Sequence, residues 1–579
     1  MIGTAIVILD GVEQTRGDLE LGVFCGDDCR GTVLAVEGDV HWLYYLTVAG
    51  TTNDQLTFRL YDHTLQQELD VTCQNEPLTF VINGEFGDWD VPYEAVFTTN
   101  VSNVQNITAG DWSDPDIWGG AAPSPTSNVT IAANCTLDDD VTVASLTINT
   151  GSTLTIESGH TLVVTGELIS TSVGDLVIAD GGQLINASAN VNATLQKDIS
   201  AYTTKDSDGW YLIGSPMDEM PIEGSAFTTP EYDLYRYNET SIGEEWENYK
   251  AGNAGFTTFE NGRGYLYANN NNFTPAFVGT LNHDDISYNV TFTDRTDGLS
   301  GINLVGNPFP HAIYKGAGGA IDDADLASGF YTLNNEGAWS IHIHEDAIMP
   351  GQGILVRTTT AKSIDIVKTN AAATAESGSA KGTEERLDIV VTGANGMDRT
   401  FVYFGQGIGL EKMDNFSSAV PSLWIHSRES DYAIAHVNKE CESLDVFFNN
   451  RMSGEFRLSV NPKNCDLGYL RLIDEVAGTV VDLLQEPDYV FQANGNETDA
   501  RFRLVFMVTT GAEEETIDAP FAYVVDGRIV LIGVGDDASL NVYDMTGRTV
   551  SAEGRLAQGV YVLRLMDGKT VKTQKIVVK

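Results

Sequence analysis

Short runs in which apolar and polar residues alternate cover much of the chain, and most of them end at Gly, Asp or Asn. Alternation with a period of two places successive side chains on opposite faces of a strand. Val, Ile, Thr and aromatic residues, which favour strands, fill these runs. The pattern predicts an all-β, multidomain protein of β-sandwich (Ig-like) modules with a short β-solenoid segment.

Residues 1–98 contain about seven such runs, among them TAIVILDG, VHWLYYLTVAG and QLTFRLYD, and they show no helical periodicity. This number of strands in so short a segment is typical of a β-sandwich module. The following residues, 99–108, lack a strand-forming run and are expected to be a linker.

Residues 109–195 show short apolar alternations that recur at steps of about eight residues, with a glycine in each turn. The turn glycines are Gly151, Gly159 and Gly166. A short strand, a tight turn and another short strand, repeated, predict a short β-solenoid whose alternating residues stack inside the coil. The residues expected to cap its open end are Trp112, Trp118 and Pro123. An ordinary β-sandwich is the alternative for this segment.

Residues 196–370 contain two similar stretches at a spacing of about 90 residues. The first begins with WYLIGSPM and the second with INLVGNPF. The matches that keep their order are Leu212-Ile213-Gly214 with Leu304-Val305-Gly306, Tyr235 with Tyr331, Trp246 with Trp339, and Gly262-x-Gly264 with Gly351-x-Gly353. The sequence therefore predicts a duplicated β unit of two related halves packed together.

Two stretches without strand-forming runs, 371–386 and 509–518, read as linkers. Between them, residues 387–508 return to runs such as RTFVYFG and GEFRLSV, which predict a further β-sandwich module. The last segment, 519–579, consists of strands and turns and is close to neutral, unlike the rest of the chain. This difference in charge suggests a separate role for the last segment.

The charge of the whole chain limits its partners. There are 82 Asp and Glu residues against 33 Lys and Arg, a formal charge of −49. Because such a surface repels phosphate groups, nucleic acid and anionic lipid are poor partners. No uninterrupted apolar stretch approaches about 18 residues, so no membrane span is expected. No Cys-x-x-Cys pair suggests a zinc site, and the most plausible disulfides in an oxidising compartment are Cys25–Cys29 and Cys441–Cys465.

The last segment carries a specific pattern: a strand that ends in Asp-x-x-Gly-Arg, a Gly-x-Tyr before the next strand, a glycine turn, and a final strand with lysines. The residues at these positions are Asp544, Gly547, Arg548, Gly559, Tyr561, Lys575 and Lys579. In this pattern residues 519–579 resemble the C-terminal (type A) sorting domain of cargo of the bacterial type IX secretion system. The Tyr-Pro-Asn-Pro common at the start of such domains is replaced here by FAYVVDGRI.

The resemblance implies a protein of Bacteroidota-type bacteria whose last domain is recognised by the type IX secretion machinery and then removed. The exposed acidic linker 509–518 is the expected cleavage region. The resemblance also implies a Sec signal peptide, but MIGTAIVILDGVEQTRGD has only a short apolar run with no basic residue before it. An upstream part is therefore expected to be missing.

Candidate chemistry within the chain is sparse. No Gly-x-Ser-x-Gly motif or cysteine in a peptidase context suggests a nucleophile. His342 and His344 would share a face if they lay in one strand and could meet one metal ion, but two half-exposed histidines are the favoured interpretation. Asp138-Asp139-Asp140 and Asp114-x-Asp116 could offer oxygen ligands to calcium, whereas solvated turn carboxylates are the default. No catalytic residue, metal site or cofactor is predicted.

Aromatic residues crowd the duplicated region and raise the prospect of surface glycan binding, because sugar rings stack on flat aromatic faces. The candidates are Trp246 and Trp339, with Trp210, Tyr232, Tyr235, Tyr237 and Tyr249 nearby. The alternative is that a β core uses these side chains for buried area.

We therefore expect a non-enzymatic, structural or adhesive protein, located outside the cell or at the outer-membrane surface. The alternative is an accessory, glycan-binding C-terminal part of a larger secreted peptidase or glycoside hydrolase.

Overall fold

The computed structural model describes residues 1–38, 40–64, 66–69, 71–100, 102–204, 207–252, 255–368, 384–417, 420–427, 430–495, 500–508, 521–525, 527–531, 538–552, 554–567 and 570–578. The linker predicted at 509–518 and most of the one predicted at 371–386 lie outside these ranges. The chain divides into two compact units, Met1–Thr194 with Val278–Leu281, and Leu195–Phe277 with Asn282–Lys579.

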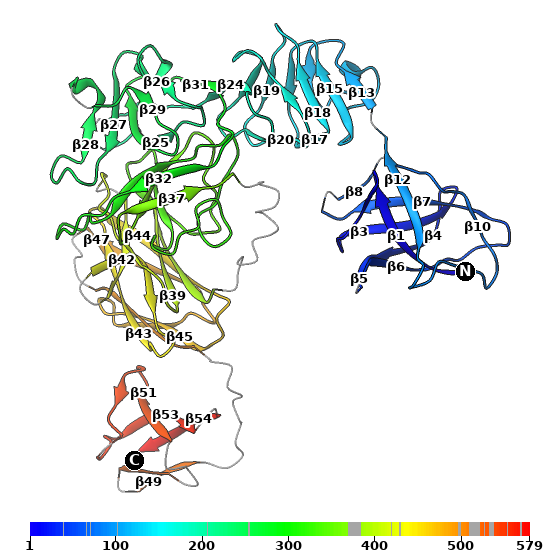
Figure 1. Cartoon of the computed structure of the whole chain (residues 1–579). Helices are drawn as coiled ribbons and strands as arrows, with labels where there is room; N and C mark the ends of the chain where they lie inside the picture. Colours follow the sequence, from blue (N-terminus) through cyan, green and yellow to red (C-terminus); the bar gives the residue numbers. More distant parts are fainter. Residues whose placement is uncertain are drawn as a thin grey trace. The chain divides into compact units, whose positions relative to one another are not determined.

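Both units are built of strands, which confirms the predicted all-β, multidomain fold (Figure 1). In the described part of the chain the helices are short 3-10 turns: η1 (Pro115–Trp118), η2 (Ala226–Thr228) and η3 (Tyr249–Ala251). None of them is long and apolar enough to cross a membrane.

The first unit begins with a β-sandwich, in which two sheets enclose one core. The first sheet has the order β5-β6-β1-β12-β9, and β2 and β11 also pair with β1. Its strands are β1 (Ile2–Leu9), β2 (Val12–Glu13), β5 (Val36–Glu37), β6 (Trp42–Thr47), β9 (Val71–Cys73), β11 (Glu85–Phe86) and β12 (Tyr93–Thr99).

The second sheet of this sandwich has the order β10-β7-β3-β4, with β8 paired to β7. Its strands are β3 (Leu19–Cys25), β4 (Asp28–Leu34), β7 (Gln55–Asp62), β8 (Gln67–Glu68) and β10 (Leu78–Thr79). Strand β7 shows why the sequence folds this way: Leu56, Phe58 and Leu60 alternate with more exposed residues and point into the core.

The second part of the first unit is the predicted solenoid, formed by three sheets in which strands of successive coils pair in parallel. The first holds β13 (Ser102–Gln105), β15 (Ser127–Ile131), β18 (Ser145–Ile148) and β21 (Leu168–Ile169). The second holds β14 (Gly110–Asp111), β16 (Cys135–Leu137), β19 (Leu154–Ile156), β22 (Leu176–Ile178), β24 (Asn192–Gln196) and β31 (Ala276–Thr280). At the end of this second sheet, β31 runs antiparallel to β24. The third holds β17 (Val141–Val143), β20 (Thr161–Val164) and β23 (Gln183–Asn186).

Residues in equivalent positions of successive coils stack in register. Cys135, Leu154 and Leu176 form one such row, and all three are buried. The prediction of a linker over 99–108 was wrong, because Ser102–Gln105 pairs in parallel with β15 and forms the first strand of the coil. This strand was not predicted because its own residues are polar except for Val104.

Trp112 and Trp118 lie at this N-terminal end of the solenoid. Both are buried, their ring centroids are 4.8 Å apart, and the Trp118 Nε1–H donates to the carbonyl of Trp112 at 2.8 Å. These indoles close the core of the first coil, where no earlier coil stacks on it.

The second unit contains two four-stranded antiparallel sheets with the same strand order. The first repeat has the order β25-β30-β27-β28 and the second has the order β33-β36-β34-β35. The strands of the first are β25 (Trp210–Gly214), β27 (Tyr232–Tyr237), β28 (Trp246–Asn248) and β30 (Gly264–Asn269). Those of the second are β33 (Ile302–Gly306), β34 (Phe330–Leu333), β35 (Trp339–His342) and β36 (Gly353–Arg357). The sequence repeat is thus matched strand by strand in the sheets.

The two repeats meet through a reciprocal backbone contact. The Gly214 N–H donates to the Gly351 carbonyl at 3.1 Å, and the Gly306 N–H donates to the Gly262 carbonyl at 3.0 Å. A side chain on Gly214 would approach the Cα of Gly306 to 2.6 Å, so both positions need glycine for space. The repeated glycines of the sequence therefore mark the place where the two halves cross.

Two small pairs complete the repeats: β26 (Met220–Pro221) with β29 (Thr258–Phe259), and β32 (Ile286–Val290) with β37 (Lys362–Ile366). The described strands between Arg386 and Val508 form one continuous sheet, which differs from the two sheets of the predicted sandwich. Its order is β46-β45-β48-β43-β41-β42-β39-β38-β44-β47, and β40 pairs with β42. The sheet curls over one core. This curling is shown by a hydrogen bond from the Tyr489 hydroxyl of β47 to Asp474 of β45, two strands that lie near opposite ends of the sheet order.

The strands of this curled sheet are β38 (Arg386–Gly393), β39 (Gly396–Phe404), β40 (Leu410–Glu411), β41 (Ser422–Ser427), β42 (Ser430–Val437), β43 (Ser443–Asn449), β44 (Ser453–Lys463), β45 (Leu467–Asp474), β46 (Thr479–Asp482), β47 (Asp488–Asn494) and β48 (Phe502–Val508). A second core cluster joins the sheet to both repeats. Phe401, Tyr403 and Ile434 of the sheet pack in it with Leu212 and Leu304 of the repeats.

The C-terminal segment has a hairpin, β49 (Ala522–Val525) with β50 (Arg528–Leu531), and a sheet of order β52-β51-β53-β54. The strands of that sheet are β51 (Ser539–Asp544), β52 (Thr549–Val550), β53 (Gly559–Asp567) and β54 (Thr570–Val578). Gln574 of β54 hydrogen-bonds the backbone of Ala522, which ties the hairpin to the last strand.

Neither predicted disulfide is formed, and all six cysteines are free thiols. In the β3–β4 pair Cys25 lies opposite Asp28 and Cys29 lies opposite Phe24, so the two cysteines are not direct cross-strand partners. The Cys441 and Cys465 thiols donate instead to the carbonyls of Ser443 and Arg386.

Replacing Gly306 with Ala should lower the stability of the second unit by about 1–3 kcal/mol, because the new Cβ would lie 2.5 Å from the carbonyl oxygen of Arg263. Urea denaturation followed by tryptophan fluorescence measures the change. The control is Gly454→Ala, where a Cβ meets nothing within 4 Å and stability should be unchanged. Equal effects of the two substitutions would contradict the close crossing of the repeats.

Candidate functional site

The residues of the C-terminal pattern form a closed turn and the strands beside it. The Asp544 carboxylate accepts hydrogen bonds from the Thr546 and Arg548 amides at 2.8 and 3.1 Å, and the Gly547 N–H donates to the Asp544 carbonyl at 3.0 Å. Gly547 has φ +79°, a conformation that side chains other than glycine rarely adopt. Asp544 and Gly547 therefore shape the turn, which leaves the Arg548 side chain exposed.

The rest of the pattern lies on the two longest strands of the same sheet. Gly559 begins β53 opposite Val578, and Tyr561 is buried with its hydroxyl donating to the Ala557 carbonyl at 2.9 Å. Lys575 is exposed on β54, and Lys579 lies outside the described residues. Gly559 and Tyr561 thus support the fold, while Arg548 and Lys575 present charge to solvent.

The two candidate tryptophans lie in equivalent positions of the two repeats, but their surroundings differ. Trp246 is half-buried in β28, with its ring 4.9 Å from that of Tyr237. Trp339 in β35 is 3% exposed and packs against Tyr331 and Phe416. The ring of Trp339 is therefore covered, and Trp246 is the more accessible of the two.

A cleft of about 950 Å³ lies beside Trp339, between the second repeat and the curled sheet. Its polar side chains include Asn334, Glu336, Ser340, His342 and Arg399. These groups offer donors and acceptors to a polar ligand. The histidine of this cleft is engaged by neighbours within the fold.

His342 and His344 do not share a site. His342 ends β35, stacks on Phe330, and places Nε2 2.7 Å from the Thr332 hydroxyl. His344 follows the strand and lies 3.5 Å from Glu384 and 3.8 Å from Glu345. In the described part of the chain, no group of three or more His, Cys, Asp or Glu residues is arranged to hold a metal ion.

Three of the aspartates considered for calcium accept hydrogen bonds within the fold. Asp138 accepts hydrogen bonds from the Ser113 amide and hydroxyl at 3.0 and 2.6 Å. Asp114 caps η1 by accepting from the Asp116 amide, and Asp140 accepts from the Thr161 amide at 2.8 Å. Asp114 therefore stabilises a local turn, while Asp138 and Asp140 tie together segments that are distant in the sequence.

Asp346 links the second repeat to the curled sheet. It accepts hydrogen bonds from the Ile343 amide and the Arg399 guanidinium, both at 2.9 Å, and lies 3.4 Å from His342. Burial alone would raise the pKa of Asp346, but the bonds with His342 and Ile343 and the charge of Arg399 lower it to about 2. Asp346 therefore stays ionised over the physiological pH range.

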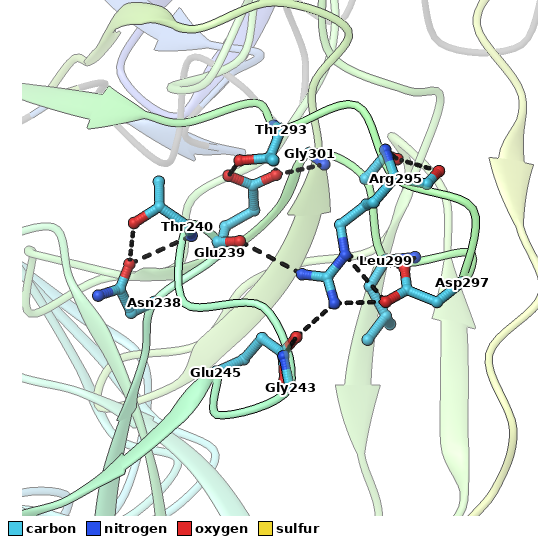
Figure 2. A network of polar contacts seen from close by, with 11 residues as sticks. Asn238, Glu239, Thr240, Gly243, Glu245, Thr293, Arg295, Asp297, Leu299 and Gly301 are labelled. Atoms are coloured by element: carbon cyan, nitrogen blue, oxygen red, sulfur yellow. Dashed lines mark hydrogen bonds and ion pairs between the residues drawn. The ribbon is translucent and has the colours of Figure 1, made fainter.

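A second polar network joins the two repeats and gives no sequence signal (Figure 2). Glu239, which is 2% exposed, accepts hydrogen bonds from the Thr293 amide at 2.5 Å and the Gly301 amide at 3.1 Å. The Arg295 guanidinium is 4% exposed and lies between Glu245 and Asp297. Glu245 and Glu239 stand 50 and 56 positions before Arg295, so only the three-dimensional fold brings them to it.

The pKa of Glu245 is lowered, because hydrogen bonds from Arg295 and Gly243 outweigh the opposing effect of burial. The pKa of Asp297 is lowered mainly by its hydrogen bonds with Arg295. Both carboxylates are thus held ionised beside one guanidinium. This arrangement fastens the β27–β28 turn of the first repeat to the segment before β33.

A family model described as a domain of unknown function, DUF8693, matches residues 104–317, which is less than half of the chain. The match includes the solenoid, the first repeat and the first strand of the second repeat. No curated protein and no solved structure matches the chain.

Replacing Asp346 with Asn should lower stability at pH 7 by about 1–2 kcal/mol. The folded pKa lies below the unfolded value of about 3.9, so the ionised form stabilises the fold above that value and its effect fades as the pH falls towards 2. Urea denaturation at several pH values should therefore show the difference shrinking between about pH 4 and pH 2. The control is Asp431→Asn, at a half-exposed pair with His426. A difference that persists unchanged at pH 2 would contradict this role.

Replacing Arg295 with Met should destabilise the second unit by about 3 kcal/mol, because it leaves Glu245 and Asp297 without their cation. Thermal unfolding and urea denaturation measure the loss. Arg503→Met removes an arginine that is 35% exposed and paired with Asp445, and should cost less than about 1 kcal/mol. Similar losses for both variants would argue against the network as the brace between the repeats.

Proposed function

We propose that the chain is a non-enzymatic structural or adhesive protein that is exported through the type IX secretion system by residues 519–579 and acts outside the cell or at its outer surface. The proposal rests on one observation: the described residues of the sorting-domain pattern occur together in one small β domain. Asp544 and Gly547 close its first turn, and Tyr561 holds the loop before β53.

The exposed members of the pattern support recognition by a receptor. Arg548 and Lys575 point into solvent, where they are available to a partner without any change in the fold. The rest of the chain is strongly acidic, with a formal charge of −49 for the whole sequence. A near-neutral terminal domain with exposed basic side chains can therefore be distinguished electrostatically from the cargo that it carries.

The engagement of polar side chains within the fold supports the proposed structural or adhesive role. The best-placed histidine, His342, is held by Thr332 and by the Asp346–Arg399 pair. The carboxylates Asp138, Asp114 and Glu239 are engaged by backbone amides. Side chains fixed in this way stabilise the β modules, which suits a structural or adhesive role.

Deleting residues 519–579 should retain the protein in the periplasm of a bacterium that carries a type IX secretion system. The measurement uses two Sec-exported reporters, one fused to residues 509–579 and one that lacks residues 519–579. Cell fractionation and surface labelling show where each reporter accumulates. Replacing both Arg548 and Lys575 with Ala should reduce surface delivery at least tenfold, since exposed charge would be lost while the fold is kept.

The matched control for this experiment is Met545→Ala, which removes a 51% exposed side chain from the same turn but lies outside the pattern. It should be delivered like the unmodified reporter. Normal surface delivery of the deletion variant would rule out the sorting role. Equal losses for Met545→Ala and the double variant would show that charge at Arg548 and Lys575 is not what is recognised.

A further inference from the structure

The two repeats are alike in strand order, but only the second has its edge strand covered. Segment 410–417 lies along β35, where the Asn415 side chain accepts a hydrogen bond from the Trp339 N–H at 2.9 Å. The Phe416 ring lies 5.6 Å from that of Trp339, and Tyr331 donates to the Glu411 carbonyl at 2.5 Å. The covering segment thus supplies an amide, an aromatic ring and backbone acceptors.

The equivalent edge of the first repeat is β28, where Trp246 corresponds to Trp339 and Tyr235 to Tyr331. Tyr331 and Trp339 are 0% and 3% exposed, whereas Tyr235 and Trp246 are both only half-buried. β28 pairs with β27 alone in the described part of the chain and is the outermost strand of its sheet (Figure 1).

The backbone of Trp246 faces away from the sheet. The Asn238 amide donates to the Glu245 carbonyl at 2.8 Å, which makes this neighbouring pair the hydrogen-bonded one. In an antiparallel ladder the next pair, Tyr237 with Trp246, then directs its amides and carbonyls outward. Trp339 has the same orientation, and there the outward N–H is the one that Asn415 binds.

We propose that the β28 edge, together with the aromatic shelf formed by Tyr235 and Trp246, binds an extended peptide in which an amide side chain is followed by an aromatic residue. The shelf continues the core cluster beneath Trp339, so the same kind of chain segment can lie on it. A strand added to an open edge gains backbone hydrogen bonds, while the shelf selects its side chains.

The charged residues Arg236 and Glu247 at this edge neutralise each other, so a peptide would be recognised by its shape rather than by its charge. Arg236 and Glu247, which are opposite each other on β27 and β28, form an ion pair at 2.5 Å and balance one another. A bound peptide therefore meets no unpaired charge from these two residues. Because β28 has three residues, it offers few backbone bonds, and the aromatic contact carries much of the affinity.

Fluorescence anisotropy with a labelled peptide of sequence GLEKMDNFS, which copies residues 409–417, tests the proposal on the full chain. Saturable binding with a dissociation constant on the order of 100 µM is expected. Trp246→Ala should weaken binding at least tenfold. Trp89→Ala, which removes a 72% exposed indole in the other unit, should leave binding unchanged.

A peptide with Ala at the position of Phe416 should also bind at least tenfold more weakly, and this comparison uses the unmodified protein, so a folding defect cannot produce the loss. The proposal is overturned if a scrambled peptide binds equally well, if Trp246→Ala has no effect, or if no binding occurs up to about 1 mM. Glycan-array binding that depends on Trp246, without peptide binding, would assign the shelf to a sugar and also overturn it. None of these outcomes depends on the route of export.

Discussion

The backbone contact at Gly214 and Gly306 is the constraint on which the arrangement of the second unit depends. Each glycine approaches the other repeat so closely that a single added carbon would collide with its backbone. The hydrogen bonds from Gly214 to Gly351 and from Gly306 to Gly262 are equivalent under exchange of the two repeats. The two sheets are therefore related by a local pseudo-twofold axis. The same face of each sheet packs on one shared core.

That symmetry is broken by the curled sheet of residues 387–508. Its segment 410–417 covers the edge of the second repeat, and Arg399 and Arg386 bind Asp346 and Glu345 just beyond the same edge strand. The first repeat is fastened differently, through Arg295 and Glu239, to the segment that leads into the second. Two similar halves therefore have different neighbours, which is why equivalent tryptophans differ in exposure.

Features that depend on local pattern could be predicted from the sequence. The solenoid follows from alternation such as Leu154 and Ile156, because each coil repeats the same two-residue period and stacks on its neighbour. Strand β13 was missed because its stability comes from pairing with β15 rather than from its own apolar residues. The network around Arg295 could not be foreseen, since Glu245 and Glu239 become its neighbours only after the chain has folded.

The excess of acidic residues gives the few basic ones a particular importance. With 33 Lys and Arg against 82 Asp and Glu, carboxylates outnumber cations by 49. The structure nevertheless buries Arg295, Arg386 and Arg501, each at 3–4% exposure and each bound to carboxylates. A buried guanidinium beside carboxylates is stable only where the surrounding fold holds it in place. These three buried cations thus serve as internal fasteners between segments of the fold, in a chain whose net charge is strongly negative.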